Sequence, residues 1–167
     1  MPSSPVIEER MNDMAIYLVQ HGKSLSKEQD PEKGISEIGV RETEQIAKVA
    51  AGYKVDVKRI IHSGKKRALQ TAEIFGRHLA PVEGVEKGEG LKPLDDVMAW
   101  SPKLEPGASL MLVGHLPFME KITGLLTTGN ADITPIKFQN SGIVCLDRDP
   151  DGGKWFIKWS LMPNIGD

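Results

Sequence analysis

This sequence of 167 residues has one cysteine, no long apolar segment and no large excess of one charge. The single cysteine, Cys145, excludes an internal disulfide framework and a cysteine-rich metal site. No apolar run approaches the roughly 18 residues that a membrane-spanning helix needs. Lys and Arg total 21 against 23 for Asp and Glu, and this net charge of −2 argues against a general nucleic-acid binder. We therefore expect no nucleic-acid partner and no membrane partner.

The N-terminal stretch is polar and acidic, without the basic and then apolar pattern of a signal sequence. We interpret residues 1–13 as a flexible leader and residues 14–167 as a single domain, the usual size for one domain. The missing signal sequence and the lone cysteine favour a cytoplasmic location. No apolar helix face is left over, so we expect a monomer.

Three apolar runs rich in β-formers predict strands that are buried on both faces, as in a parallel sheet covered by helices. They lie at residues 15–19, 59–62 and 110–113, and a helical pattern follows each of them. Two further strand-like segments, 142–146 and 155–159, flank an Asp-Pro-Asp-Gly-Gly turn. This order predicts an α/β fold. We expect a three-layer sandwich, with a mainly parallel central sheet, helices on both faces and an antiparallel C-terminal hairpin.

Local signals predict the limits of several elements. Ser36 is a good N-cap and Gly52 a good stop for the first helix. The apolar stripe of that helix is predicted to be Ile46, Val49, Ala50 and Tyr53. Residues 83–96 are interpreted as a loop that contains a short strand and opens into a helix near Pro93. Trp155 and Trp159 are predicted to share one core-facing side of the last strand.

Two predicted strands end in the same way, in Tyr-Leu-Val-Gln-His at 17–21 and Met-Leu-Val-Gly-His at 111–115. In open α/β sheets, ligands bind in the crevice outside the carboxyl ends of the strands. One histidine there is often an ordinary loop residue, but two in the same setting, His21 and His115, favour a functional site. Arg67 also follows a strand and falls in the first turn of a helix, where main-chain N–H groups already favour anions. Two histidines and one arginine at the same edge predict a phosphoryl pocket, and we find no ligand cluster for a metal.

Four motifs occur in order along most of the chain. They are Gln20-His21-Gly22, the D-P-E-x-x-I-S-x-x-G segment from Asp30 to Gly39, the S-x-x-x-R-A-x-Q-T-A segment from Ser63 to Ala72, and the V-G-H-x-P segment from Val113 to Pro117. Together they resemble the histidine phosphatase superfamily, and in particular its small branch of SixA-type phosphohistidine phosphatases. The resemblance implies a phosphoglycerate-mutase-like fold and hydrolysis without a cofactor or metal.

The resemblance also implies roles for individual residues. His21 would be the nucleophile that takes the phosphoryl group, Arg67 would bind the phosphate oxygens, and His115 would stabilise the transferring group. A neutral imidazole is a competent nucleophile near neutral pH because its ordinary pKa is about 6.5. Further candidates for phosphate binding are Gln20, Gly22, Lys23, Lys33 and Gly114.

Two positions depart from the pattern of the superfamily. Gln20 stands where the superfamily usually has an arginine, and Lys33 stands where many relatives carry the arginine of their Arg-Pro-Leu-Thr segment. We hypothesise that Lys23 supplies the missing charge. Lys23→Ala should then weaken vanadate binding severalfold, and an unchanged affinity would reject this hypothesis.

The expected function is that of a phosphohistidine phosphatase acting on a phosphorylated protein. The chain is too short for a capping domain, and an uncovered pocket suits a protein side chain as substrate. The alternatives are a phosphatase for a small phosphorylated compound, such as a phosphomonoester, and a catalytically weakened phosphate-binding regulatory module. A phosphomonoesterase uses a carboxylic acid for its leaving group, and nothing in the sequence singles one out. The candidates are Glu83, Glu86, Glu89, Asp95 and Asp96.

Overall fold

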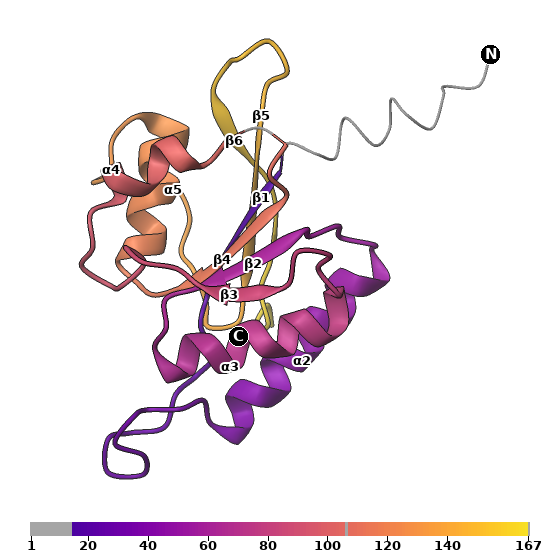
Figure 1. Cartoon of the computed structure of the whole chain (residues 1–167). Helices are drawn as coiled ribbons and strands as arrows, with labels where there is room; N and C mark the ends of the chain where they lie inside the picture. The colour runs from indigo at the N-terminus through magenta and orange to yellow at the C-terminus, as the bar shows by residue number, and fades with distance from the viewer. Residues whose placement is uncertain (1–14, 106, 167) are drawn as a thin grey trace, which may run out of the picture.

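The computed structural model describes residues 15–105 and 107–166, and the expected leader, residues 1–13, lies outside the described part. A six-stranded sheet runs through the centre in the order β3-β2-β4-β1-β5-β6 (Figure 1). The strands are β1 (Ile16–Gln20), β2 (Arg59–His62), β3 (Val85–Lys87), β4 (Leu110–Gly114), β5 (Ile143–Arg148) and β6 (Trp155–Leu161). The pairs β3·β2, β2·β4 and β4·β1 are parallel, whereas β1·β5 and β5·β6 are antiparallel.

Helices cover both faces of the sheet, which confirms the predicted three-layer sandwich (Figure 1). They are α2 (Glu37–Gly52), α3 (Lys66–Leu79), α4 (Val97–Trp100) and α5 (Phe118–Thr128), with a 3-10 turn η1 (Ser101–Lys103) after α4. Tyr17 and Val19 of β1 pack in the core under α2 and α3, and Ile16 and Leu18 in the core under α5. Burial on both sides explains why this strand is a continuous apolar run.

The helix signals were correct except at two places. Ser36 caps α2 through a hydrogen bond from Gly39 N to its side chain, and the helix ends at Gly52. Tyr53 follows the helix and is 82% exposed, so it does not belong to the buried stripe. The buried positions of α2 are Gly39, Thr43, Ile46, Ala47 and Ala50. Pro93 lies in a turn, and α4 begins only at Val97 because Asp96 caps it by accepting from Met98 N.

The prediction that Trp155 and Trp159 share one side of the last strand is wrong. A bulge interrupts the β5·β6 pairing, so Trp159 pairs with Cys145 while Ile157 pairs with the next residue, Leu146. The extra residue reverses the alternation of side chains. Trp155 therefore packs in the core under α5, and Trp159 packs beside the core under α2 and α3.

Within the described ranges, 15–105 and 107–166, no helix combines the length and the apolar character needed to cross a bilayer.

Candidate active site

The carboxyl ends of β1, β2 and β4 meet at one edge of the sheet. Gln20 pairs with Gly114 at the ends of β1 and β4, and His62 of β2 pairs with Val113. The residue directly after β1 is His21 and the residue directly after β4 is His115, so their side chains meet. The ring centroids of His21 and His115 lie 5.0 Å apart, with the ring planes tilted by 54°.

The His21 ring is held in one orientation by two hydrogen bonds. Its Nδ1 donates to the carbonyl oxygen of Gly22 at 2.7 Å, which assigns the proton to Nδ1. Nε2 therefore carries the lone pair, and it accepts from Arg67 Nε at 3.3 Å. Burial, with smaller contributions from the positive charges of Arg67 and Lys33, lowers the pKa of His21 to about 4, although the hydrogen bond to Gly22 acts in the opposite direction. The ring is thus neutral near pH 7.

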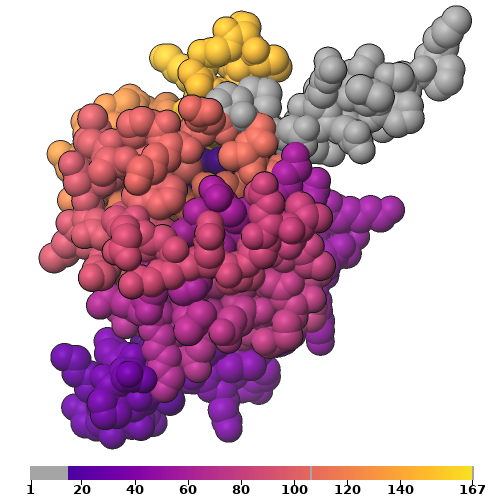
Figure 2. Space-filling model, in the orientation of Figure 1, coloured from indigo at the N-terminus to yellow at the C-terminus, as the bar shows by residue number. Residues whose placement is uncertain are grey.

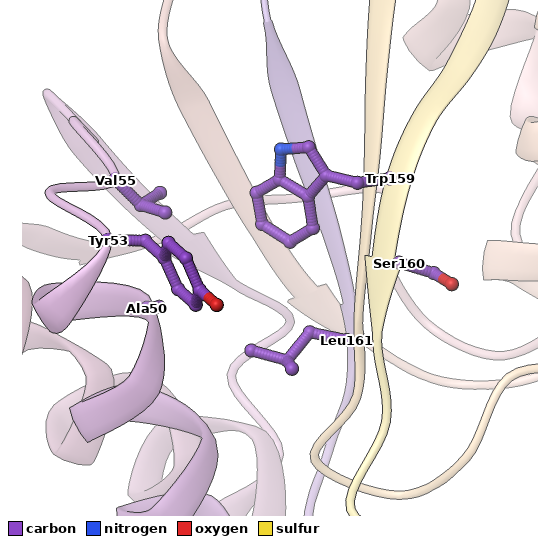
Figure 3. Close-up of a pocket in the computed structure, with 6 residues that line it drawn as sticks. All are labelled: Ala50, Tyr53, Val55, Trp159, Ser160 and Leu161. Atoms are coloured by element: carbon purple, nitrogen blue, oxygen red, sulfur yellow. The ribbon is translucent and has the colours of Figure 1, made fainter. Parts of the chain in front are cut away.

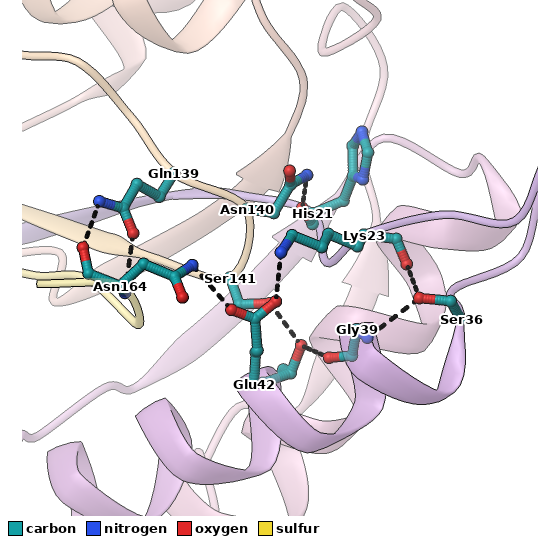
Figure 4. Close-up of polar contacts among 10 residues, drawn as sticks. His21, Lys23, Ser36, Gly39, Glu42, Gln139, Asn140, Ser141 and Asn164 are labelled. Carbon is teal, nitrogen blue, oxygen red and sulfur yellow. Dashed lines mark hydrogen bonds and ion pairs between the residues drawn. The ribbon is translucent and has the colours of Figure 1, made fainter. Parts of the chain in front are cut away.

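The main chain around His21 is also fixed. Its N–H donates to Gly114 O at 2.9 Å, and its carbonyl oxygen accepts from Asn140 Nδ2 at 2.8 Å (Figure 4). Ser141 N donates to the preceding carbonyl, that of Gln20, at 2.9 Å. The segment before β5 therefore holds the end of β1 in place from the side opposite β4.

Gly22 lies where the chain leaves β1 between α2 and α3. Its N–H donates to Thr71 Oγ1 at 2.9 Å. A Cβ at this position would lie 2.9 Å from Thr43 Oγ1 and 3.2 Å from Ser141 Oγ, closer than side chains normally approach. Thr43 and Ser141 are themselves hydrogen-bonded at 2.7 Å. Glycine is needed here because any side chain would push the His21 loop away from α2 and from Ser141.

His115 is nearly inaccessible, with 2% of its surface exposed. Its Nε2 is hydrogen-bonded to Ser63 Oγ at 2.6 Å, and its Nδ1 is buried without a hydrogen-bond partner in the described structure. Burial lowers the pKa of His115 to about 3, with smaller contributions from His21 and Arg67. His115 is therefore a second neutral ring that retains hydrogen-bonding capacity at the site.

Arg67 reaches the site from the first turn of α3. Lys65, the N-cap residue directly before this helix, makes no capping hydrogen bond with its side chain, so the helix N-terminus remains open to an anion. Thr71 Oγ1 donates to Arg67 O at 2.7 Å and accepts from Gly22 N, which couples this turn to the His21 loop. Burial lowers the pKa of the Arg67 guanidinium, which nevertheless stays charged.

The remaining predicted phosphate-binding residues fall into different settings. Gly114 lies against Met119 and the Leu91 carbonyl, and a Cβ there would be 2.8 Å from Met119 Cε. Gln20 Oε1 is buried without a hydrogen-bond partner in residues 15–105 and 107–166. Lys33 lines a pocket together with Arg67, and its φ of 52° lies in the left-handed region that disfavours lysine.

Lys23 extends toward Glu42 and forms an ion pair with it at 3.3 Å (Figure 4). Glu42 is held in turn by Asn164 Nδ2 at 2.9 Å. The role of Lys23 as a replacement for the missing arginine charge stays a prediction. Vanadate affinity of Lys23→Ala tests it, with Glu42→Gln as the matched variant. If Lys23 supplies the charge, the first should bind vanadate severalfold more weakly and the second more tightly.

Four of the five carboxylates considered as a leaving-group acid already have partners. Glu86 pairs with Arg59 and Glu89 with Lys87, at 3.3 and 3.4 Å. Asp95 accepts from Lys92 N at 2.8 Å, and Asp96 from Met98 N at 2.9 Å. The contacts of these four side chains therefore single out none of them as the acid that protonates the leaving group.

The pockets of the molecule differ in character. An apolar pocket of about 480 Å³ lies between the end of α2 and β6, lined by Ala50, Tyr53, Val55, Trp159, Ser160 and Leu161 (Figure 3). It contains none of the predicted site residues. A basic pocket of about 450 Å³ includes Arg67 and lies beside the two histidines. Within the described residues, no group of three or more His, Cys, Asp or Glu side chains is placed to hold a metal ion.

A sequence profile of the histidine phosphatase superfamily (branch 1) matches residues 16–95. The match includes His21 and Arg67, the two groups whose nitrogens meet in the structure. Over this region the chain is similar to the histidine phosphatase superfamily. Phosphohistidine phosphatase SixA of Escherichia coli K12 is 29% identical over 156 residues, which cover 90% of this chain and 94% of that protein.

Solved structures of this superfamily have the same fold. The structure of the protein histidine phosphatase SixA complexed with tungstate gives a TM-score of 0.74 at 25% identity, covering 90% of this chain and 97% of the other. A structure described as SixA of Agrobacterium tumefaciens gives 0.73 at 25% identity, covering 90% and 98%. The phosphatase fold is thus shared over nearly the whole described chain.

The two buried histidines predict a specific dependence of stability on pH. Their pKa values of about 4 and about 3 lie below the value near 6.5 of an unfolded histidine. Between these values the unfolded chain binds more protons, so stability present above about pH 6.5 is lost as the pH falls toward 4. We expect the melting temperature to drop by about 5 °C between about pH 7 and about pH 5.

Calorimetry of the wild type and His115→Gln measures this effect. The variant should show a smaller drop over the same interval, since one of the two linked groups is gone. Asp30 does not contribute over this interval, because its pKa is held near 2 mainly by its hydrogen bond from Lys66. An equal drop in both proteins, or a constant melting temperature, would contradict the assignment.

Proposed function

We propose that this protein is a phosphohistidine phosphatase, which hydrolyses the phosphoryl group of a phosphorylated histidine in a protein through a covalent intermediate on His21. The observation that carries this proposal is the orientation of His21. Its Nδ1 donates its proton to the Gly22 carbonyl oxygen in a hydrogen bond. Its unprotonated Nε2 faces Arg67, and the ring lies beside that of His115. The similarity to the SixA phosphatases supports the same activity.

In the first step, the lone pair of His21 Nε2 attacks phosphorus. The P–N bond of the substrate breaks while the new bond to Nε2 forms. Arg67 and the open N-terminus of α3 bind the phosphoryl oxygens, because phosphoryl transfer depends mainly on positioning and charge stabilisation. The phosphorylated His21 ring is cationic with its proton still on Nδ1, and the carbonyl of Gly22 stabilises that charge.

In the second step, water attacks phosphorus and the P–Nε2 bond breaks. The products are dihydrogen phosphate and neutral His21, which still has its proton on Nδ1. The ring gains and loses no proton in the cycle, so the fixed bond to Gly22 is compatible with both steps. His115, whose ring lies 5.0 Å from that of His21 and whose Nδ1 has no hydrogen-bond partner among the described residues, would hydrogen-bond the oxygens of the transferring group.

The leaving group distinguishes a phosphohistidine from a phosphomonoester. A substrate imidazole that carries a proton on its second nitrogen leaves as a neutral ring, so no acid has to protonate it. An alkoxide needs such an acid. Four of the five candidate acids, Glu86, Glu89, Asp95 and Asp96, are engaged by other partners, and this supports a substrate that needs no acid; Glu83 is the remaining candidate. A cytoplasmic location stays a prediction.

The test compares phosphate release from a phosphohistidine peptide, a phosphoserine peptide and a small sugar phosphate at equal concentrations. We expect kcat/KM for the phosphohistidine peptide to exceed the other two by about 100-fold or more. A preference for the sugar phosphate would replace the proposal with a small-molecule phosphatase. Binding of vanadate without turnover of any substrate would indicate a phosphate-binding module, as expected if Gln20 disables the site.

A further inference from the structure

The basic pocket beside the two histidines is built from two segments. The loop between β1 and α2 contributes Lys27, Pro31, Glu32 and Lys33, and the start of α3 contributes Lys65, Lys66 and Arg67. The loop projects from the molecule at the lower left of Figure 2. Because this loop lines the pocket, one wall of the pocket is a projecting segment. Arg67 belongs both to the pocket and to the phosphoryl site, so the two are continuous.

The charge of this pocket exceeds what one phosphoryl group requires. Five of its seven lining residues are Lys or Arg, and Glu32 is the single carboxylate. Lys66 is compensated, since its ammonium lies 2.8 Å from Asp30 and 3.8 Å from Glu32. In the part of the chain that the structure describes, the other three lysines form no ion pair. They are Lys27, Lys33 and Lys65.

The loop is fastened to α3, so the lysines are not on a freely moving segment. Asp30 Oδ2 accepts from Gly34 N at 2.9 Å and from Lys66 Nζ at 2.8 Å. Gln70 Oε1 accepts from Ile35 N at 2.8 Å. A Cβ at Gly34 would lie 2.9 Å from both acceptors, so glycine allows the close approach. The same clamp holds Lys33 at its positive φ, and backbone strain of this kind concentrates at functional sites.

We propose that this pocket binds carboxylates of an acidic segment next to the phosphohistidine in the substrate protein. The inference rests on the proposed function and names the kind of phosphoprotein that the site prefers. With the phosphoryl group between His21, Arg67 and His115, neighbouring substrate residues extend over the pocket that Arg67 shares. Glutamate or aspartate there would meet the lysines that lack an internal partner, and a volume of about 450 Å³ admits such side chains.

The experiment compares two phosphohistidine peptides that differ only in having glutamates or glutamines beside the phosphorylated residue. Phosphoramidate, which has no flanking group, reports the chemical step alone. We expect wild-type kcat/KM to be about 5-fold higher for the glutamate peptide at low salt. Lys27→Glu should abolish this preference and leave phosphoramidate turnover unchanged. Lys27 is exposed and lies outside the groups around the reacting phosphorus. Lys48→Glu, on the exposed side of α2, is the matched charge reversal and should keep the preference.

Equal turnover of both peptides by the wild type would overturn this inference and leave the proposed phosphatase activity intact. Loss of the preference in Lys48→Glu as well would also overturn it, since the effect would then follow net charge. An unchanged preference for the glutamate peptide in Lys27→Glu would overturn it too. Failure of all three N-phosphate substrates would reject the proposed function itself.

Discussion

Replacement of His21 by alanine is expected to reduce kcat for phosphoramidate and for a phosphohistidine peptide by about 10⁴-fold or more. The reason is that Nδ1 of this ring is engaged by Gly22, so the unprotonated Nε2 is the nitrogen that meets Arg67, in a ring that lies 5.0 Å from that of His115. Steady-state release of inorganic phosphate measures the effect. Vanadate affinity and the melting temperature of the variant establish that the fold and the anion pocket remain.

His78→Ala is the matched control for this substitution. His78 lies in the last turn of α3, where its ring pairs with Glu44, away from the carboxyl ends of the strands. Its removal should leave kcat within about 2-fold of the wild type. A residual activity of His21→Ala within a factor of about ten of the wild type would contradict the role of His21 as nucleophile.

The second large effect is expected at Arg67. We expect Arg67→Ala to lower kcat/KM by about 10²–10³-fold, the usual result of removing one donor that stabilises developing negative charge. Arg67→Lys should recover only part of the loss, because an ammonium keeps the charge without the planar pair of donors. Initial rates with phosphoramidate measure both variants.

Arg77→Ala provides the control on the same helix. This residue lies in the last turn of α3, and its 62% exposed side chain pairs with Glu44 at 3.3 Å. Activity should be unchanged, although the melting temperature can fall slightly. If Arg67→Ala and Arg77→Ala had the same activity, Arg67 would not bind the transferring group.

The fold and the meeting of the two histidines could be predicted because both depend on local signals that tertiary structure reinforces. Buried parallel strands require continuous apolar runs, and their carboxyl ends lie at one edge of the sheet. A histidine directly after β1 and another directly after β4 must therefore become neighbours once these strands pair. The register Gln20↔Gly114 fulfils this requirement.

The parts that could not be predicted depend on contacts between distant segments. Asn140 and Ser141 position the end of β1, yet neither belongs to a motif and both lie about 120 residues away from it. The bulge between the two tryptophans shifts the β5·β6 register by one residue, and no residue in the hairpin predicts it. Ser63 and Thr71 do lie within a recognised motif, so their contacts with His115 and Gly22 could have been suspected from it.

Trapping the covalent intermediate tests the central claim most directly. Wild type and His21→Ala are mixed with radiolabelled phosphoramidate, quenched in base within the first turnover, and assayed for labelled protein and free phosphate. The mechanism predicts label on the wild type that survives base, is lost in acid, and is absent from the variant. Release of phosphate by the wild type with no labelled protein at any time, or equal labelling of His21→Ala, would contradict it.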